Sequence, residues 1–551
     1  MVPSPPHRYL FMGLLIGALT GWTVEGSGWG LPEGLLRGVD VLGICGALAI
    51  WYYYEYASQS PAHVRGAELE DLRNPTTPPA GHAVSANVRA MAARWSSGPG
   101  ATGSRSPTER EITIGTVAIP RSVEPQGFLL TGAPGTGKSV TVAGILDVVR
   151  ARGNERAIVY DPTGEFLTWF AQPGDVILNP LDKRSEYWVP WRDAHTSTEY
   201  ERLAEALVPE NPHQPFWHTS ARALLSACLA ETHDMRGLLA LMGADNTTLS
   251  EVLRRHGMAG LEGDDRTLAN VRSAMVAPTI SLRYLSDPPD GRAPFSIREW
   301  AQRGSGWLWL TSTVPTHDTT LRPLLSLWID IATVAVMELP PDRERRVWLV
   351  LDELRRLQQL PALQSALAGG RKYGLSAVLG IQTIAQLSAV YGQDEARAIL
   401  GMPQTQLILR TPDPDTAGWA SRAIGERHVV REVYGTSRSP LGPGESITYQ
   451  HDREPTVLAS EIQGLKDLEG YLRVANDPTI KQVRLEPQDR TKKVKSYVPA
   501  PSPSAATSGP AASSQPPKPE TTPEPRQETE TPAPAPTRPS ERYRHPELDV
   551  R

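Results

Sequence analysis

The sequence predicts an α/β fold that is interrupted by an all-helical insertion, and three observations predict it. The apolar run Phe128–Leu130 enters a glycine-rich turn, and apolar residues at helical spacing follow the turn. A second apolar run, within Arg346–Glu353, has the uninterrupted hydrophobicity of a buried parallel strand. Between these two halves lies a long stretch whose apolar residues recur at the period of helices.

Length and composition limit the classes of protein to which this chain can belong. Its 551 residues are too many for one ordinary core, which predicts two folded units plus appendages. The apolar share of 40% and the charged share of 21% are those of a globular protein. Cys45 and Cys228 show no metal-ligand spacing, so we interpret them as packing residues in a reducing compartment. A formal charge of -5 predicts no global attraction to nucleic acid, so any such contact requires a local basic surface.

Residues 1–56 are predicted to form a transmembrane hairpin anchor. Two uncharged apolar runs, Tyr9–Val24 and Val41–Tyr54, are separated by a short segment that contains acidic and glycine residues. Each run is shorter than the roughly 20 residues that cross a bilayer comfortably. Tryptophan and tyrosine cluster at the run ends, where amphipathic rings prefer the headgroup region. A cleaved signal peptide is the alternative, but no small-x-small cleavage pattern follows the first run.

Two further segments carry no visible chemistry. Residues 57–110 are rich in Pro, Gly, Ser and Ala and are interpreted as a cytoplasmic linker. Residues 498–551 consist almost entirely of Pro, Ala, Ser, Thr, Glu and Arg, and they hold many of the 51 prolines of the chain. Such a composition cannot bury enough apolar surface to offset chain entropy, which predicts a disordered Pro-rich tail. Composition leaves two functions open for it, a solubilising extension and a docking arm for a partner.

The segment GAPGTGKS at 132–139 matches the phosphate-binding pattern G-x-x-x-x-G-K-[ST] at every fixed position. The preceding strand, the following helix and the stop at Gly153 supply the context that this pattern requires. We expect Lys138 to reach the β- and γ-phosphates of ATP and Ser139 to ligate Mg2+. The predicted nucleotide-binding residues are Gly132, Ala133, Pro134, Gly135, Thr136, Gly137, Lys138, Ser139 and Val140.

The run at Arg346–Glu353 ends in two carboxylates, which a magnesium-nucleotide site requires on a neighbouring strand. We expect Asp352 to hold Mg2+, directly or through water, and Glu353 to polarise the attacking water. Gln382 follows a third strand at Leu375–Ile381 and could orient water or sense the γ-phosphate; a strand-capping amide is the alternative. Arg371 is interpreted either as an arginine finger that reaches a neighbouring subunit or as a solvated basic turn.

Asp161 closes a strand at Ala157–Tyr160 and is interpreted as a supporting residue of the site or as a turn former. Residues 111–185 and 305–497 form the two parts of the nucleotide-binding domain, since Lys138 and Asp352 are separated by far more chain than a minimal core needs. Residues 186–304 are the predicted all-α insertion.

Three capping boxes predict helix starts within the insertion, at Thr198 with Glu201, Thr248 with Glu251, and Ser296 with Glu299. A stripe at helical spacing predicts a core helix, and its members are Trp217, Ala221, Leu224, Leu225, Cys228 and Leu229. The α/β core then resumes with a strand at Trp307–Leu310 and an amphipathic segment at Leu321–Met337.

Over residues 110–485 the chain resembles the TraD/TrwB-type coupling proteins of conjugative type IV secretion. Several motifs in order carry the resemblance: GTVAIPRSVEPQGFLLTGAPGTGKS, VYDPTGEF followed by DVILNPLDKRSEYW, VWLVLDEL, GGRKYGLSAVLGIQTIAQL with YG soon after, and ASEIQGLKDLEGYL. The family implies a RecA-like P-loop domain with an inserted all-α domain and a homo-hexameric ring around a DNA channel. The resemblance implies the family roles for Lys138, Ser139, Asp352, Glu353 and Gln382, and the role of the finger for Arg371.

The resemblance also implies an activity, partners and a location. ATP hydrolysis with Mg2+ would drive translocation of single-stranded and duplex DNA without sequence preference. The partners would be a relaxase with its relaxosome proteins and the inner-membrane type IV secretion components. A two-pass anchor would hold the protein in the bacterial inner membrane, with the catalytic domains in the cytoplasm. Two departures from the family stand out: the apolar runs of the hairpin are short, and the Pro-rich tail need not share a partner with any relative's extension.

Three rival functions remain open. An FtsK-like chromosomal DNA pump resembles this chain in its motor, but such pumps end in a winged-helix reader and this sequence ends in a proline-rich tail. A motor that moves protein or phage is not excluded by the sequence. A nucleotide-switched substrate receptor without pumping is the third, and an intact Glu353 argues against it because a pure switch needs no hydrolytic base.

Overall fold

The computed structural model describes residues 62–73, 110–211, 214–258, 265–286, 291, 293–312, 315–439 and 442–500. All of them fall within one compact unit, Met1–Ala500. The predicted anchor at 1–56 and the tail beyond residue 500 lie outside the described residues. The predicted linker at 57–110 differs from expectation in one part, because the strands β1 (Ala62–Gly66) and β2 (Glu68–Asp71) lie within it.

The centre of the fold is a mixed sheet whose described strands have the order β2-β15-β14-β11-β5-β10-β9-β6-β8-β7. Besides β2, these are β5 (Phe128–Thr131), β6 (Arg156–Asp161), β7 (Val176–Leu178), β8 (Leu308–Thr311), β9 (Val347–Leu351), β10 (Leu375–Ile381), β11 (Thr405–Leu409), β14 (Glu469–Arg473) and β15 (Thr479–Arg484). The stretch from β11 to β7 is parallel, whereas β14 pairs antiparallel with β11 and with β15. The predicted α/β class is confirmed, and so are the strands expected around residues 128, 157, 308, 349 and 378.

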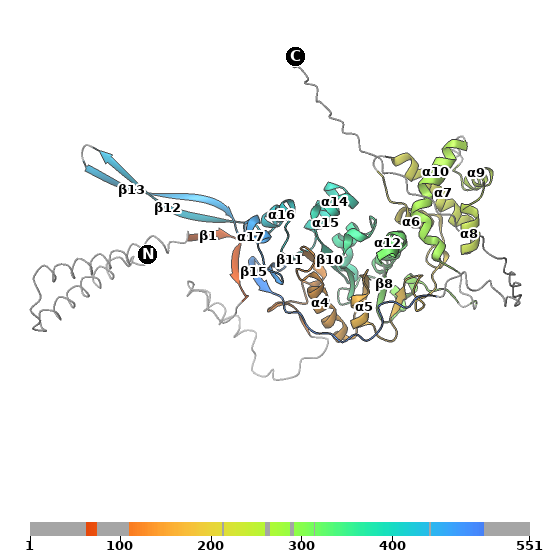
Figure 1. Ribbon diagram of the computed structural model, residues 1–551, viewed down its shortest axis with the longest axis horizontal. Coiled ribbons are helices and arrows are strands. Elements are labelled where there is room, and N and C mark those ends of the chain that lie inside the picture. The colour runs from red at the N-terminus through yellow and green to blue at the C-terminus, as the bar shows by residue number, and fades with distance from the viewer. Residues whose placement is uncertain are drawn as a thin grey trace, which may run out of the picture. The chain divides into compact units, whose positions relative to one another are not determined.

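Helices cover both faces of the sheet, as strands that are apolar on both sides require. One face carries α4 (Lys138–Arg152) and α5 (Glu165–Phe170); the other carries α12 (Pro315–Met337), α13 (Leu363–Gly369), α14 (Ile384–Tyr391) and α15 (Gln393–Gly401). Successive residues of β9 face opposite sides of the sheet. Trp348 and Val350 pack in the core with α4 and α5, and Leu349 and Leu351 pack in the core with α12. Figure 1 shows α4 and α5 below the strands and α12, α14 and α15 above them.

Smaller elements pack around the central sheet. The helices α16 (Pro414–Ile424) and α17 (Ala459–Gln463) pack over the antiparallel edge of the sheet in a third cluster with Ile408 and Tyr471. A short hairpin of β3 (Ile112–Ile114) and β4 (Val117–Ile119) packs against α4 with its alternate residues buried.

The insertion is helical where it is described. Its helices are α6 (Ser197–Leu207), α7 (Pro215–Glu231), α8 (Met235–Met242), α9 (Asn246–Arg255), α10 (Asp265–Thr279) and α11 (Ile297–Arg303). The predicted stripe on α7 is buried from Ala221 to Leu229, and Trp217 packs against the same core. This core continues into the sheet through α12, because one cluster of buried residues contains both Leu224 and Leu349. The domain limits 111–185, 186–304 and 305–497 therefore remain predictions.

Asp193 joins the two ends of the insertion. Its Oδ1 accepts hydrogen bonds from the Ser296 hydroxyl at 2.7 Å and from the Arg298 amide at 2.9 Å. Its Oδ2 accepts from the Trp188 indole at 2.6 Å and from the Ile297 amide at 3.0 Å. The side chain is 2% exposed, so these donors replace the water that a buried carboxylate requires. One residue near the start of the insertion thus holds the beginning of α11.

The helix caps correct two of the three predicted starts. α6 begins at Ser197, and its capping box is formed by Thr196 with Glu199 rather than by Thr198. α9 is capped by Asp245, whose carboxylate accepts from the Thr248 amide, so Thr248 lies inside the helix. Only Ser296 is the predicted cap, and it accepts from the Glu299 amide. In both wrong cases another N-cap former precedes the expected one by a few residues, and spacing alone cannot choose between them.

The segment Leu321–Met337 was expected to be amphipathic, and this expectation is wrong. The helix α12 buries nearly every residue from Leu321 to Val336, because the sheet packs on one side of it and the insertion on the other. The part of α12 from Thr319 to Met337 is long and apolar enough to span a membrane, and no other described helix is. Of its most apolar stretch, 72% is buried inside the protein. Its apolar character is therefore explained by its place in the core.

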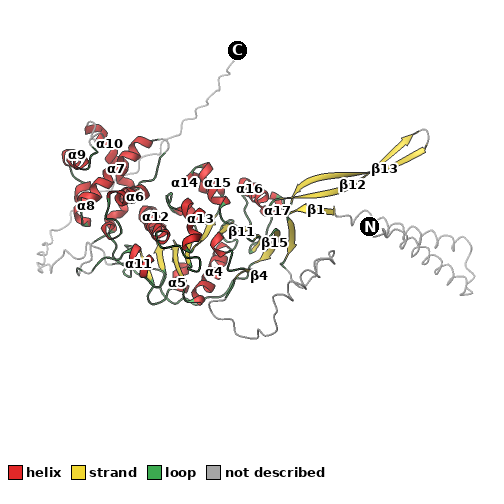
Figure 2. Cartoon of the chain, turned by 180° about the vertical axis from the view of Figure 1, so that it is seen from behind, coloured by secondary structure: helices red, strands yellow, loops and turns green. Residues whose placement is uncertain are grey.

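A long hairpin of β12 (Glu426–Ser439) and β13 (Gly442–Pro455) leaves the sheet beside α16 and α17, with β1 along its base (Figure 2). β1 runs antiparallel to β12, with Ala62 opposite Val430 and Gly66 opposite Arg427. The first residue of β1 therefore lies on the side of the hairpin turn, and its last residue lies on the side of the sheet. This register sets the direction in which the chain enters the fold.

Candidate functional site

The glycine-rich turn between β5 and α4 adopts a conformation that side chains would obstruct. Gly135 and Gly137 have φ values of 78° and 119°, in the left-handed region that glycine populates without strain. A Cβ on Gly132 would lie 2.7 Å from the Thr136 hydroxyl. Gly137 caps α4 without a side-chain hydrogen bond, so the first amides of this helix keep donors for a ligand. The turn therefore has the form of an anion site at a helix start.

Lys138 folds back over the turn. Its ammonium donates to the carbonyl oxygens of Gly132 at 2.5 Å and of Ala133 at 3.1 Å, and the residue is buried. Burial lowers the pKa of Lys138, and the nearby carboxylates of Asp352 and Glu353 act in the opposite direction. A buried ammonium that is held only by carbonyl oxygens and distant carboxylates is a ready partner for phosphate.

Asp352 lies across from the turn at the end of β9. Its Oδ2 accepts a hydrogen bond of 3.3 Å from the Ser139 hydroxyl, and its Oδ1 is buried without a hydrogen-bond partner among the described residues. Burial raises the pKa of Asp352 to about 6, against the attraction of Lys138, which lowers it. An unpartnered carboxylate oxygen beside a hydroxyl is the oxygen-rich ligand set that Mg2+ prefers. The residues present therefore fit the predicted cation.

Gly380 makes this arrangement possible, although it is not among the predicted site residues. A Cβ on Gly380 would lie 1.9 Å from the backbone oxygen of Asp352, a distance that no side chain can tolerate. The carboxyl ends of β9 and β10 can therefore approach closely only because this position has no side chain. A glycine inside an otherwise apolar strand was the available signal.

Glu353 is held by three side chains. Its Oε1 accepts from the Gln382 amide at 2.6 Å and from the Arg355 Nε at 2.8 Å. Its Oε2 lies 2.5 Å from the Arg356 Nε. The amide of Gln382 thus contacts the predicted catalytic carboxylate rather than capping its own strand. The two arginines were missed, although they follow the paired acids directly in the sequence.

Arg371 is not part of this constellation within one chain. It lies in the turn Gly370–Tyr373, before the amino end of β10, whereas Gln382 follows the carboxyl end. A seven-residue strand is roughly 20 Å long, so Arg371 lies at the amino ends of the parallel strands and the glycine turn lies at their carboxyl ends. Arg371 is exposed in the single chain. An arginine so placed does not reach the glycine turn of its own chain, and its role as a finger stays a prediction.

Asp161 supports the loop next to the site. Its carboxylate accepts from the Leu167 amide at 2.8 Å, the Glu165 amide at 3.2 Å and the Thr163 hydroxyl at 3.2 Å. It therefore organises the start of α5, which is the turn-forming role rather than a ligand role. Burial raises the pKa of Asp161 to about 6, and the charge of Asp352 adds to this effect.

The carboxyl-terminal part of the fold contacts the glycine turn. The Leu468 amide donates to the Thr136 carbonyl at 3.0 Å, and the Ala133 amide donates to the Arg410 carbonyl at 2.9 Å. Leu468 itself has a positive φ of 66°, which is uncommon for a non-glycine residue. The Arg410 guanidinium pairs with Asp467 at 2.5 Å. These contacts pair polar backbone groups of the turn, and no sequence motif indicated them.

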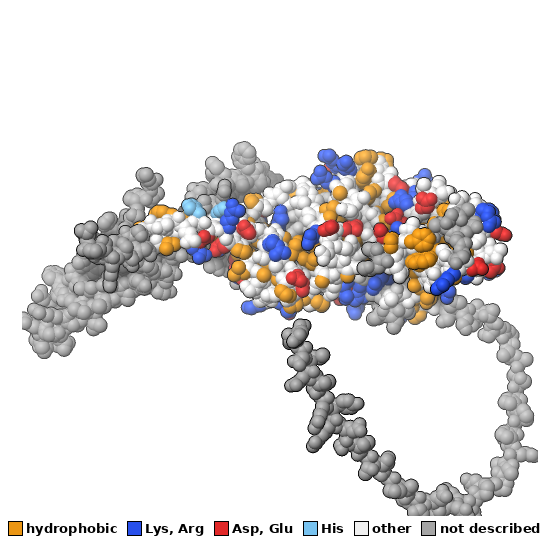
Figure 3. Space-filling view, turned by 90° about the horizontal axis from the view of Figure 1, so that it is seen from above, with side chains coloured by type: hydrophobic (Ala, Val, Ile, Leu, Met, Phe, Trp, Pro, Cys, Tyr) orange, Lys and Arg blue, Asp and Glu red, His pale blue; other side chains and the backbone are white. Residues whose placement is uncertain are grey.

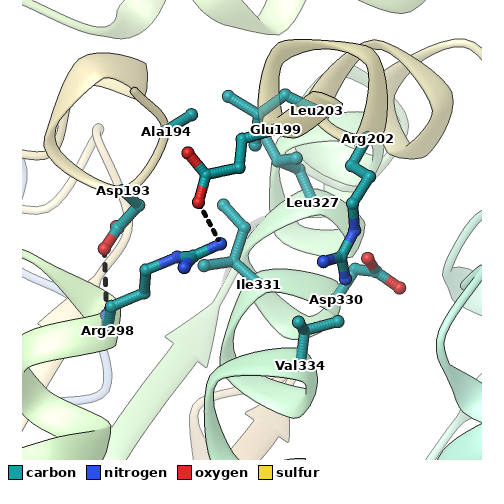
Figure 4. Close-up of a pocket in the computed structure, with 10 residues that line it drawn as sticks. All are labelled: Asp193, Ala194, Glu199, Arg202, Leu203, Arg298, Leu327, Asp330, Ile331 and Val334. Carbon is teal, nitrogen blue, oxygen red and sulfur yellow. Dashed lines mark hydrogen bonds and ion pairs between the residues drawn. The ribbon is translucent and has the colours of Figure 1, made fainter. Parts of the chain in front are cut away.

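A second hollow lies between α6, α11 and α12 and contains none of the predicted site residues (Figure 4). Arg298 bridges it, through a 3.0 Å contact with Glu199 and a backbone hydrogen bond to Asp193. Asp330 lines the same hollow and accepts from the Ala362 amide at 2.8 Å, and burial raises its pKa to about 6. The charged side chains that line this hollow bind one another or other groups of the same chain. We therefore assign the hollow to the packing of the insertion on the core.

Comparison with known proteins agrees with this geometry. Residues 111–486 match the family described as the type IV secretion-system coupling protein DNA-binding domain. The chain is 31% identical over 408 residues to the coupling protein TraD of Escherichia coli strain K12. The matched region is 71% of this chain and 57% of that relative, so the chain spans little more than half of the relative's length.

Solved structures of the plasmid coupling protein TrwB share the fold. The structure of TrwB in complex with ADP and Mg2+ is 27% identical, with a TM-score of 0.66, and covers 80% of this chain and 99% of TrwB. TrwB in complex with a non-hydrolysable ATP analogue gives the same identity and TM-score over 81% of this chain and 99% of TrwB.

Proposed function

Because the chain belongs to the type IV secretion-system coupling protein family, we propose that it is an ATPase that moves DNA toward a membrane secretion channel. The observation that carries this proposal is the convergence of Lys138, Ser139 and Asp352 on the glycine turn. TrwB binds ADP with Mg2+ and an ATP analogue, and these are the ligands that we propose here. Lys138 and the turn amides would hold the phosphates, and Ser139 and Asp352 would hold Mg2+.

The chain's own residues account for the hydrolytic step. Magnesium, when bound, neutralises charge on the β- and γ-phosphates. Lys138 exchanges its carbonyl partners for phosphate oxygens, and the amides at the start of α4 orient the same group. Glu353 accepts a hydrogen bond from the attacking water and draws its proton, and Gln382 keeps that carboxylate in place. To accept this hydrogen bond and then the proton, Glu353 needs an oxygen that can face the attacking water.

We propose further that six copies form the working ring. Arg371 lies at the amino ends of the parallel strands, whereas the glycine turn of the same chain lies at their carboxyl ends. This position favours the use of Arg371 as a finger at the site of a neighbour. A ring also places the same surface of every copy around a central DNA strand. The partners would be a relaxase with its relaxosome proteins and the inner-membrane secretion components.

DNA binding would depend on local groups of basic side chains. The formal charge of -5 gives no net attraction, yet Figure 3 shows Lys and Arg gathered in several separate groups among acidic side chains. Binding through such groups recognises the phosphate backbone, which predicts affinity that falls with salt and is indifferent to sequence.

We place the chain in the bacterial inner membrane through residues 1–56, with the catalytic part in the cytoplasm. The register of β1 gives the direction from which such an anchor would join the fold, because Ala62 lies on the side of the hairpin turn, away from the sheet. The segment before β1 thus joins the fold on the side opposite to the nucleotide-binding core. The two apolar runs are the sequence basis for a two-pass anchor.

The test is ATP hydrolysis by the detergent-solubilised full chain, with and without single-stranded and duplex DNA. A motor should be stimulated by DNA, and Lys138→Ala should abolish turnover while a matched Lys492→Ala variant stays active. A nucleotide-switched receptor predicts nucleotide binding without DNA-stimulated turnover. Normal turnover or normal DNA transfer by the Lys138→Ala protein would refute the motor.

A further inference from the structure

Both oxygens of the Glu353 carboxylate are occupied by neighbouring arginines. Arg355 and Arg356 follow the acid within one short turn, Leu354–Arg356, and each places its Nε on a different oxygen, at 2.8 Å and 2.5 Å. Gln382 adds a third donor at 2.6 Å. The side chain of Glu353 is only 14% exposed, whereas those of Arg355 and Arg356 are 43% and 30% exposed. The arginines therefore lie between the carboxylate and solvent.

This arrangement conflicts with the role of Glu353 in hydrolysis. A carboxylate orients water through a free oxygen within hydrogen-bond reach of that water. Here each oxygen is held by a charge-assisted hydrogen bond, which is roughly twice as strong as a neutral one. The two arginines therefore restrain the carboxylate and limit its approach to the attacking water, so hydrolysis should speed up when another group accepts them.

The surroundings of Arg355 indicate what that acceptor is. Arg355 and Glu353 line a small pocket together with Gln382, Thr383 and Gln386. Apart from Glu353, the polar side chains of this pocket can all donate hydrogen bonds. A planar guanidinium matches the oxygens of a phosphate as well as those of a carboxylate. The ligand whose chemistry matches these donors is a phosphodiester group, which has a negative charge and several acceptor oxygens and would meet the exposed guanidinium of Arg355 at the mouth of this small pocket.

We propose that Arg355 and Arg356 are shared between Glu353 and the phosphates of the DNA strand. Without DNA they hold the carboxylate and keep hydrolysis slow. When a strand reaches the exposed faces of these two arginines, its phosphates take over the guanidinium groups, and Glu353 is released toward the attacking water. The inference rests on the proposed DNA-driven ATPase and names the positioning residues that couple its two ligands. Coupling of this kind is reciprocal, so removing the carboxylate must strengthen DNA binding.

Turnover gives the first test, using the full chain with Arg355→Ala, Arg356→Ala and the double variant. DNA-free turnover should rise by roughly 5-fold or more, the range of typical coupling energies, and the stimulation by DNA should fall toward one. Arg397→Ala is the matched control, since Arg397 is exposed and pairs only at 3.7 Å with an exposed acid. An unchanged stimulation ratio, or a loss of turnover with and without DNA, would overturn the inference. So would an equal stimulation by an acidic polypeptide, because the proposed acceptor is a phosphodiester.

DNA binding without nucleotide gives the second test and does not depend on turnover. Glu353→Gln should bind a labelled single-stranded oligonucleotide more tightly than the wild type, because the arginines are no longer held. In the Arg355→Ala/Arg356→Ala background, Glu353→Gln should have no such effect, and the salt slope should fall by about 1.4 for two lost phosphate contacts. Equal tightening in both backgrounds would overturn the inference.

Different results would contradict the proposed function and the sharing of the arginines. A wild-type chain that neither hydrolyses ATP nor binds DNA contradicts the proposed function itself. A wild-type chain that is stimulated by DNA, with variants stimulated to the same degree, contradicts only the sharing of the arginines. Thermal melting of each variant, compared with Arg397→Ala, shows whether a loss of activity comes from unfolding.

Discussion

The Ser139 hydroxyl donates a 3.3 Å hydrogen bond to the Asp352 carboxylate, although 213 positions separate the two residues. The contact joins the first turn of α4, which follows β5, to the end of β9, across the end of the intervening strand β10. It brings a hydroxyl and a buried carboxylate oxygen to one point, as a small oxygen-ligated cation requires. Within the intervening chain, Asp193 accepts hydrogen bonds from Ser296 and Ile297, which lie 103 and 104 positions later in the sequence.

Asp352→Asn should retain the fold and lose the Mg2+ dependence of nucleotide binding. The amide has the same shape and can still accept from Ser139, but it has no charge with which to hold the cation. Titration of Mg2+ into the protein with a fluorescent nucleotide should show at least roughly 10-fold weaker Mg2+ binding. Asp394→Asn is the control, since the side chain of Asp394 is fully exposed. Unchanged Mg2+ affinity would contradict the placement of the cation.

Gly380→Ala should abolish hydrolysis, because the added methyl would lie 1.9 Å from the Asp352 backbone oxygen and push β9 and β10 apart. Gly144→Ala is the matched control, since a Cβ there meets nothing within 4 Å and alanine in a helix stabilises by roughly 0.5–1 kcal/mol. Turnover and melting temperature measure both. An active Gly380→Ala protein would show that the strand ends need not approach so closely.

Arg152→Met should destabilise the chain strongly. Its guanidinium is fully buried and pairs with Glu124 at 2.6 Å and Glu155 at 3.2 Å. Burial raises the pKa of Glu124, and Arg152 counteracts that effect. Removing one partner of a buried ion pair typically costs about 3–5 kcal/mol, since the remaining charges stay buried. The melting temperature should fall well below that of Arg397→Ala, and a near-native value would contradict this account.

Asp330→Asn should stabilise the chain at neutral pH but not at acidic pH. Burial raises the pKa of Asp330 to about 6, while the Ala362 amide and Arg202 lower it and Glu205 raises it. A raised folded-state pKa contributes stability below about pH 4 that is lost as the pH rises to about 6. The loss is at most roughly 3 kcal/mol, and an uncharged amide avoids it. Melting curves at pH 4.5 and pH 7.5 should diverge only at the higher pH; an equal shift at both would contradict the assignment.

Asp193→Ala should loosen the insertion before the rest of the chain unfolds. It removes four hydrogen bonds from Trp188, Ser296, Ile297 and Arg298 and leaves their donors without this partner. Unsatisfied buried donors cost about 1–3 kcal/mol each. Limited proteolysis should cut near residues 190 and 290 first, whereas the exposed Asp394→Ala control should resist. A digestion pattern like that of the wild type would show that other contacts hold the insertion.

The strands of the parallel core could be predicted because burial on both faces leaves an uninterrupted apolar run, as in β9 and β10. The helix starts were harder. Thr196 and Thr198 are both good N-cap residues with glutamate three positions later, and in the structure the first of them is the cap. The segment that became α12 was misjudged because its polar residues Ser326, Asp330 and Thr333 recur at helical spacing, yet all three are buried in the core.

The sequence by itself determined the local conformations at this site: the left-handed glycines of the turn, the helix that starts at Lys138 and the strand that ends at Asp352. These depend on neighbouring residues and on backbone sterics, which a linear pattern records. Only the tertiary structure decided that Gly380 lies against Asp352, that Arg371 is at the opposite ends of the strands from the glycine turn and that Arg355 and Arg356 hold Glu353. Strand order and side-chain rotamers set those distances, and neither is written in the spacing of residues along the chain.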